Sequence, residues 1–227
     1  MSSLPFVRLW IWISVFASLA GWTLSVSRQL NHSGYAIFFI AFAIFIFLRR
    51  KDFGFVPPNR FSRRKKFLRR FKRPLPFCFT ALVILIFLGG AIYTPVNYAA
   101  LTYRVPRVLQ WLAHGQWFWI HTTNYRMNDR ACGIEWLSAP ILLFTNSTRL
   151  LFPLNFLPFL LLPGLIFSVF TKLGVRARVA WQWMWLLPTG YNFILQAGSI
   201  ANDTFPTIYI LAAIDFGLRA WKTRKLF

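Results

Sequence analysis

Long apolar runs alternate with short polar or basic segments along most of the chain. A helix needs roughly 20 predominantly apolar residues to cross a lipid bilayer. The pattern predicts membrane-crossing helices over six segments, which are residues 9–26, 35–48, 74–93, 150–170, 179–195 and 204–220. Pro153, Pro158 and Pro163 predict kinks in the fourth segment, and Pro188 with Gly190 predicts a break in the fifth.

Residues 97–135 differ from the rest because they are polar, aromatic-rich and set between apolar runs. Apolar residues recur there at Val105, Val108, Leu109 and Leu112, which is a helical spacing. We expect a helix over residues 105–113 that lies in the membrane plane and ends at Gly115. The apolar stretch of residues 135–144 is too short to cross, so it predicts a second interfacial or re-entrant helix.

Composition and charge place this pattern in a membrane. The 227-residue chain is 57% hydrophobic, has a mean hydropathy of +0.50 and carries a net charge of +21. Residues 49–73 are dense in Lys and Arg, and such clusters mark the cytoplasmic side. They are also candidates for binding anionic lipid headgroups. Both termini are then expected in the cytoplasm and residues 97–135 outside. The sequence has no nucleic-acid-binding motif.

The fold class predicted from these patterns is all-α. We expect a polytopic helical membrane protein with about six transmembrane helices, plus interfacial helices in the first large external loop. We expect the chain to form one membrane domain. Residues 1–73 form its N-terminal hairpin and basic loop, and residues 74–227 form its core.

Acidic residues are scarce, so each one outside is a candidate for chemistry. The chain has five, and Asp129, Glu135 and Asp203 fall on the predicted outer side. Four arginines share that side: Arg104, Arg107, Arg126 and Arg130. Arginine grips phosphate through paired hydrogen bonds, and a carboxylate can take a proton from an acceptor hydroxyl.

Simpler roles compete with these. Glu135 also suits the first turn of an interfacial helix, and Asn202 and Asp203 suit the cap of the last span. Arg104 and Arg107 also suit the membrane interface as long cationic side chains. Asp129 adjoins Arg130 and fits a solvated ion pair. His114 and His121 lack a carboxylate at ligand spacing, so no metal site is predicted.

Two stretches resemble bacterial membrane glycosyltransferases of the GT-C fold, similar to dolichyl-phosphate-mannose and arabinosyl transferase-like proteins. The first is Asn97-Tyr98-x-Ala100-Leu101-x-Tyr103-Arg104-x-Pro106-Arg107, followed by Trp111 and Gly115. The second is Leu195-Gln196-Ala197-Gly198-Ser199-x-x-Asn202-Asp203. The resemblance covers residues 95–220.

The resemblance implies transfer of a sugar from a polyprenyl-phosphate donor at the outer face of the bacterial inner membrane. It implies Glu135 and Asp203 as catalytic acids. The implied substrate-binding residues are Tyr103, Arg104, Arg107 and Asn202. We add Arg126 and Arg130 because they are external arginines that could grip the same phosphate. It implies no cofactor and leaves a divalent cation open.

This sequence departs from the family at residue 99 and in length. The family's catalytic aspartate would directly follow Tyr98, but Ala99 stands there and cannot take a proton. Such enzymes also have more spans and an outer domain. We therefore expect a truncated, weakly active or inactive enzyme. The alternatives are a non-catalytic membrane subunit or relic and, less favoured, a small transporter.

Overall fold

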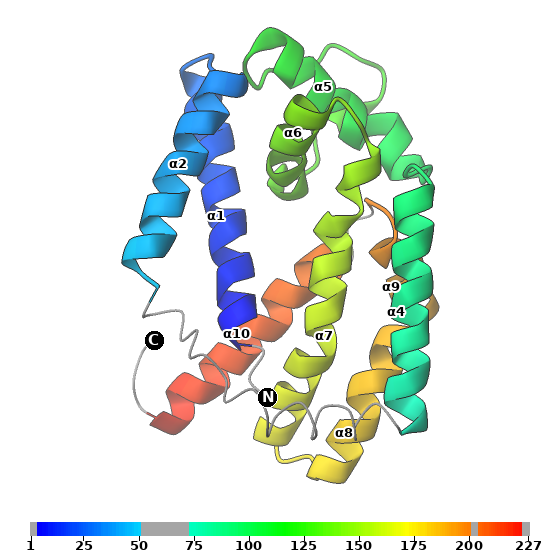
Figure 1. Ribbon diagram of the computed structural model, residues 1–227. Helices are drawn as coiled ribbons and strands as arrows, with labels where there is room; N and C mark the ends of the chain where they lie inside the picture. The colour runs from blue at the N-terminus through cyan, green and yellow to red at the C-terminus, as the bar shows by residue number, and fades with distance from the viewer. Residues whose placement is uncertain (1–3, 51–72, 201–203, 224–227) are drawn as a thin grey trace.

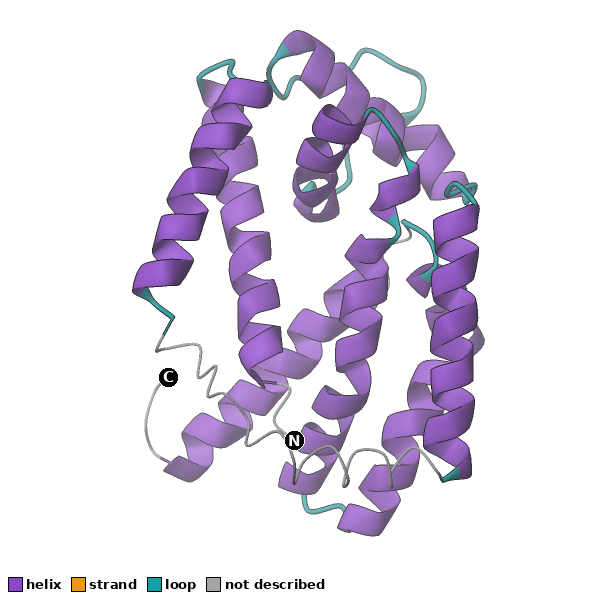
Figure 2. Ribbon diagram, in the orientation of Figure 1, coloured by secondary structure: helices purple, strands orange, loops and turns teal. Residues whose placement is uncertain are grey.

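Helices make up all the regular structure in the part of the chain that the structure describes. A computed structural model describes residues 4–50, 73–200 and 204–223, and Figure 2 shows no strand among them. The all-helical prediction is confirmed. Most of the basic segment 49–73 lies outside the described residues, as do Asn202 and Asp203.

Seven helices correspond to the apolar runs. They are α1 (Leu4–Val26), α2 (His32–Leu48), α4 (Pro74–Ile92), α7 (Pro153–Lys172), α8 (Ala177–Leu186), α9 (Tyr191–Ala197) and α10 (Thr204–Thr223). Figure 1 shows them as an elongated bundle. The N-terminal end of α1, the turn between α7 and α8, and the C-terminal end of α10 lie together at the lower end in this view.

Within the described residues, three helical segments are long and apolar enough to cross a membrane. They are Pro5–Val26, Pro74–Ile92 and Arg149–Lys172. Helix α2 is apolar but has only 17 residues. Helix α10 carries charges at Asp215 and Arg219. The structure therefore supports a membrane protein, and six crossings stay a prediction.

The predicted break in the fifth apolar segment is present. Helix α8 ends at Leu186, a single turn η4 (Leu187–Thr189) follows, and α9 begins at Tyr191. Pro188 has no backbone N–H, and its ring disfavours a continuing helix. The prolines of α7 act differently, because Pro153 occupies the first turn, and the helix continues through Pro158 and Pro163.

A layer of short elements covers the upper end of the bundle in Figure 1. It consists of the π-helical turn η1 (Ala100–Arg104), α5 (Val105–His114), η2 (Tyr125–Met127), α6 (Gly133–Thr145) and η3 (Arg149–Leu151). The predicted helix 105–113 is confirmed as α5. It ends as expected at Gly115, whose φ of 68° is left-handed and costs glycine little.

Helix α6 accounts for the predicted short helix over residues 135–144. It has 13 residues, and eight of them are buried. It packs against α1 and α5, with further contacts to α2 and α7. Most of this helix is therefore buried against its neighbours, and its interfacial or re-entrant placement stays a prediction.

Trp136 of α6 is the centre of the packing beneath α5. Its ring centroid lies 5.1 Å from that of Trp111 on α5 and 5.2 Å from that of Trp22 on α1. Gly21 of α1 makes room for it, because a Cβ at Gly21 would clash with the Trp136 ring. The absence of a side chain at residue 21 thus lets α1 and α6 approach each other closely.

Replacing Gly21 should loosen this packing. We expect Gly21→Ala to lower the thermal unfolding temperature, because overpacking costs roughly 1–3 kcal/mol and exceeds the gain in helix propensity of about 1 kcal/mol. The matched control is Gly89→Ala in α4, where an added Cβ meets nothing within 4 Å. Equal unfolding temperatures for the two purified variants would contradict the close approach.

Candidate anion-binding site

A polar cavity of about 440 Å³ lies where η1 and α5 face the segment that leads into α6. Its lining residues are Tyr103, Arg104, Arg107, Arg126, Asp129, Arg130, Ala131 and Glu135. They include every described residue for which the sequence predicted catalysis or substrate binding. The structure therefore brings these residues together in one place, while their roles stay predictions.

An ion pair between Arg107 and Glu135 closes one wall of the cavity. Arg107 Nη2 lies 2.5 Å from Glu135 Oε1, and both side chains are about 1% exposed. Arg107 also donates hydrogen bonds of 3.0 Å to the backbone carbonyls of Arg130 and Ala131. Breaking such a buried pair by removing one partner costs roughly 3–5 kcal/mol. This pair fixes α5 to the start of α6.

This arrangement changes the interpretation of Arg107. Arg104 and Arg107 are three residues apart on a helical segment, and the sequence analysis gave both as substrate-binding residues. Both Nη atoms of Arg107 are instead engaged by Glu135 and the two carbonyls. Arg107 therefore holds the wall of the cavity, and Arg104 is the better candidate for a bound anion.

Arg104 is buried without a counter-ion among the described residues. It is 5% exposed, and its Nη2 makes only a long contact of 3.4 Å with the Tyr103 hydroxyl. Its Nε and Nη1 have no hydrogen-bond partner in the described part of the chain. Desolvating a lone guanidinium costs several kcal/mol. An anion in the cavity would supply the missing charge and acceptors.

The loop side of the cavity carries two further arginines. The guanidinium carbon of Arg126 lies 5.7 Å from the ring centroid of Tyr98 and 6.0 Å from that of Tyr125. Arg130 Nε lies 3.5 Å from Asp129 Oδ1, and both side chains are about half exposed. Asp129 is therefore the solvated partner of Arg130 that the sequence predicted.

Two asparagines hold this loop in shape. The Asn128 side chain accepts a hydrogen bond from the backbone N–H of Ile120 at 2.9 Å and donates one to its carbonyl at 2.8 Å. Asn124 donates to the carbonyl of Thr102 at 3.1 Å and accepts from the N–H of Arg126 at 3.3 Å. These contacts tie the loop to η1 and set the position of Arg126.

The charges of the cavity do not balance. Among the described lining residues, four guanidinium groups face two carboxylates, which gives a formal net charge of +2. The second oxygen of Glu135, Oε2, has no hydrogen-bond partner in the described residues. The site therefore offers a surplus of cationic donors and one carboxylate oxygen that is free to accept a proton or a hydrogen bond.

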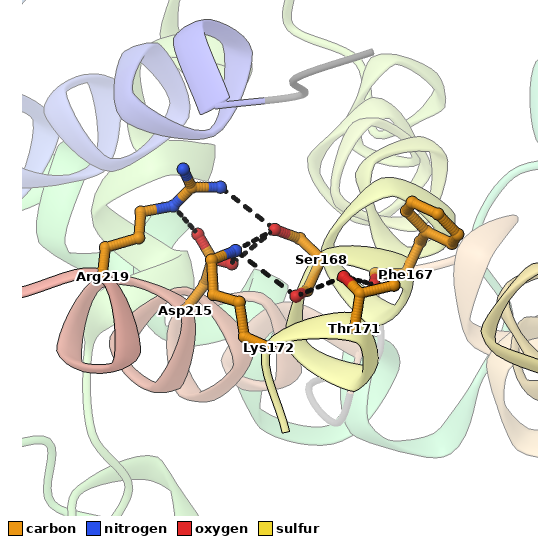
Figure 3. Close-up of polar contacts among 6 residues, drawn as sticks. All are labelled: Phe167, Ser168, Thr171, Lys172, Asp215 and Arg219. Carbon is orange, nitrogen blue, oxygen red and sulfur yellow. Dashed lines mark hydrogen bonds and ion pairs between the residues drawn. The ribbon is translucent and has the colours of Figure 1, made fainter. Parts of the chain in front are cut away.

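A second polar cluster lies between α7 and α10, and Figure 3 shows it. Asp215 is fully buried there and accepts from Lys172 at 2.6 Å, Arg219 at 2.7 Å and Ser168 at 2.6 Å. The sequence left the direction of Asp215 open. Ser168 and Lys172 are four residues apart, so they lie on one face of their helix. Asp215 and Arg219 have the same spacing and likewise share a face. Both carboxylate oxygens of Asp215 are engaged by these partners. The cluster therefore links α7 and α10.

The thiol of Cys132, at the start of α6, can test on which side of the membrane this region lies and what electrostatic environment it provides. Burial raises the pKa of its thiol above the ordinary value; Glu135 raises it further, and Arg107 acts against both. The thiolate is the reactive form. We expect an impermeant maleimide to label Cys132 from outside the cell, with a rate–pH curve shifted to higher pH than that of an exposed cysteine.

The matched control is Thr123→Cys with Cys132→Ser, because residue 123 is exposed on the same loop. Both proteins would carry Cys78→Ser. A third protein with Ser62→Cys as its only cysteine should react only after the membrane is permeabilised. Labelling of residue 62 but not residue 132 in intact cells would reverse the topology, and coincident rate–pH curves would contradict the raised pKa.

Comparisons with known proteins do not identify the chain. No protein-family model, no curated protein and no solved structure matches it. The resemblance to GT-C glycosyltransferases therefore stays a prediction from the motifs. The interpretation of function rests on the geometry and charge of the cavity.

Proposed function

We propose that this is an integral multi-pass membrane protein of glycosyltransferase type that binds a polyprenyl-phosphate-linked sugar at the outer face of a bacterial inner membrane. The observation that carries the proposal is Arg104, a buried guanidinium with unmet hydrogen-bonding capacity in a cavity of net charge +2. Phosphate oxygens supply what Arg104 lacks. Charge-assisted hydrogen bonds from arginine to phosphate are among the stronger polar contacts in proteins.

A lipid-linked ligand suits the surroundings better than a free one. A second cavity, of about 290 Å³, lies among α1, α2, α6 and α7 and has an almost wholly apolar lining. Helix α6 borders both cavities, because it contributes Glu135 to the charged one and Leu137 to the apolar one. A headgroup in the first and a hydrocarbon chain near the second would match the two chemical halves of a polyprenyl phosphate.

Removing the Arg104 charge should weaken binding of polyprenyl phosphate to the purified protein in lipid nanodiscs. A hydrogen bond to a charged group is worth about 1.5–3 kcal/mol, so Arg104→Gln should raise the dissociation constant by roughly ten- to a hundredfold. The matched control is Arg149→Gln, which removes an exposed arginine that does not line the cavity. Native mass spectrometry or a fluorescent analogue would report the dissociation constants.

Three results would decide this test. Loss of binding in Arg104→Gln alone supports the proposal. Equal binding by the wild type and both variants would refute a role for Arg104, and no binding by the wild type would refute the phosphate site. The folded fraction of each variant is checked by its unfolding temperature, so that a fall in affinity is not confused with unfolding.

Glycosyl transfer is the activity that such a donor site would serve. The acceptor oxygen would attack the anomeric carbon, the bond from that carbon to the phosphate oxygen would break, and a carboxylate would take the hydroxyl proton. The candidate acceptor of that proton is Glu135, because its Oε2 has no partner in the described residues and the residue lines the cavity. Asp203, the other candidate from the sequence, lies outside the described residues.

Restoring an acid at residue 99 should raise transfer. A positioned base contributes roughly a hundred- to ten-thousandfold in rate, and Ala99 supplies none. Residue 99 immediately precedes η1 and lies four residues before Tyr103 of the cavity lining. With radiolabelled polyprenyl-phospho-sugars, we expect very weak transfer by the unmodified chain and faster transfer by Ala99→Asp. Ala99→Asn is the matched control, because it has the same shape without a basic oxygen.

The transfer assay also distinguishes an active glycosyltransferase from a non-catalytic membrane subunit. Robust transfer by the unmodified chain would contradict the importance of residue 99. Loss of that transfer in a Glu135→Gln variant whose unfolding temperature is unchanged would identify Glu135 as the base. Absence of transfer in all variants, with intact phosphate binding, would favour a non-catalytic membrane subunit that retains the lipid-phosphate site.

A further inference from the structure

The ion pairs divide the four arginines of the cavity into two classes. Arg107 is neutralised by Glu135, and Arg130 lies beside Asp129. Arg104 and Arg126 have no carboxylate partner among the described residues. The surplus of two positive charges therefore resides on two identified side chains.

These two unpaired charges differ in their exposure to water. Arg104 is 95% buried, and its charge is therefore weakly screened, whereas Arg126 is partly exposed and stacked near the rings of Tyr98 and Tyr125. Charges in a partly buried site interact several times more strongly than charges in bulk water. A ligand with one negative charge would leave one cation uncompensated, and a ligand with two would neutralise both.

From this balance we propose that the cavity is selective for a doubly charged phosphate group. The substrate class is a phosphomonoester, as in a polyprenyl phosphate without its sugar, which carries up to two charges. A phosphodiester, as in a polyprenyl phospho-sugar, carries one. The inference rests on the proposed function and refines it, because the protein would hold the sugar-free carrier more tightly than the sugar-loaded donor.

This preference places the protein in a reaction sequence. Transfer of the sugar converts a singly charged diester into a doubly charged monoester, so the charge of the cavity favours the spent carrier. A second reaction must then consume the released monoester, and the class of that reaction is attachment of a new group to the phosphate. Arg104 and Arg126 are the residues that determine the preference, with Arg107 and Glu135 positioning the wall beside them.

The experiment compares two ligands that differ in the charge of the phosphate and by one methyl group. A short-chain polyprenyl monophosphate and its methyl ester, a phosphodiester, are titrated against the full chain in nanodiscs from pH 5.5 to pH 8. The second ionisation of a phosphomonoester has a pKa of about 6. We expect the monoester to bind about tenfold more tightly than the diester at pH 8, with the difference shrinking toward pH 5.5.

The diester also reports any titration of the protein itself, because its own charge is constant over this range. The charged or titratable side chains around Arg104 are Tyr103, Arg107, Arg126, Asp129, Arg130 and Glu135, and Cys132 adjoins Arg107 and Glu135. A change in diester affinity with pH is therefore subtracted from the monoester curve. Inorganic phosphate, tested alone, measures the headgroup without the chain.

Two variants test which residue determines the preference for the monoester. Arg126→Gln should weaken monoester binding more than diester binding and so reduce the ratio of the two dissociation constants, whereas Arg149→Gln should leave the ratio unchanged. Equal affinity for both ligands at pH 8 would overturn the selectivity and leave the proposed function standing. No binding of either ligand would overturn the proposed function. If inorganic phosphate binds as tightly as the lipid, the hydrocarbon chain makes no contribution and the ligand need not be a lipid.

Discussion

The ion pair between Arg107 and Glu135 is the interaction on which the outer layer of this molecule depends. It joins α5 to the first turn of α6, and the same guanidinium holds the carbonyls of Arg130 and Ala131. One cation thus fixes the helix that carries it, the helix that follows, and the segment between them. Because that segment leads directly from Arg126 and Asp129, this contact and the hydrogen bonds of Asn124 and Asn128 together set the shape of the cavity.

The cluster at Asp215 and the cavity contain similar polar groups but differ in how completely the described residues bond those groups. At Asp215, one carboxylate meets two cations and a hydroxyl, and both of its oxygens are engaged (Figure 3). In the cavity, Arg104 keeps unmet donors and Glu135 keeps an unpartnered oxygen. Complete bonding of the Asp215 carboxylate suits a structural link, whereas the unmet donors of Arg104 lie in a charged cavity, where a buried group without a partner requires an explanation.

Local patterns in the sequence predicted much of the fold. The apolar runs located the long helices, the spacing from Val105 to Leu112 located α5, and Pro188 with Gly190 located the break between α8 and α9. The members of the cavity were predictable because they lie within one short stretch of chain. Which arginine pairs with Glu135 was not, because Arg104 and Arg107 are equivalent in pattern and only the packing of α6 separates them. The partners of Asp215 likewise come from a distant helix.

The π-helical turn η1 has a geometric consequence for everything on either side of it. A turn of this kind bonds each N–H one residue further back than an α-helix does, so it accommodates one extra residue. One residue corresponds to about 100° of rotation in a helix. The chain before η1, where Tyr98 lies near Arg126, is therefore rotated out of phase with α5, where Arg107 meets Glu135. One continuous helical segment thus presents Tyr98 to Arg126 before η1 and Arg107 to Glu135 after it.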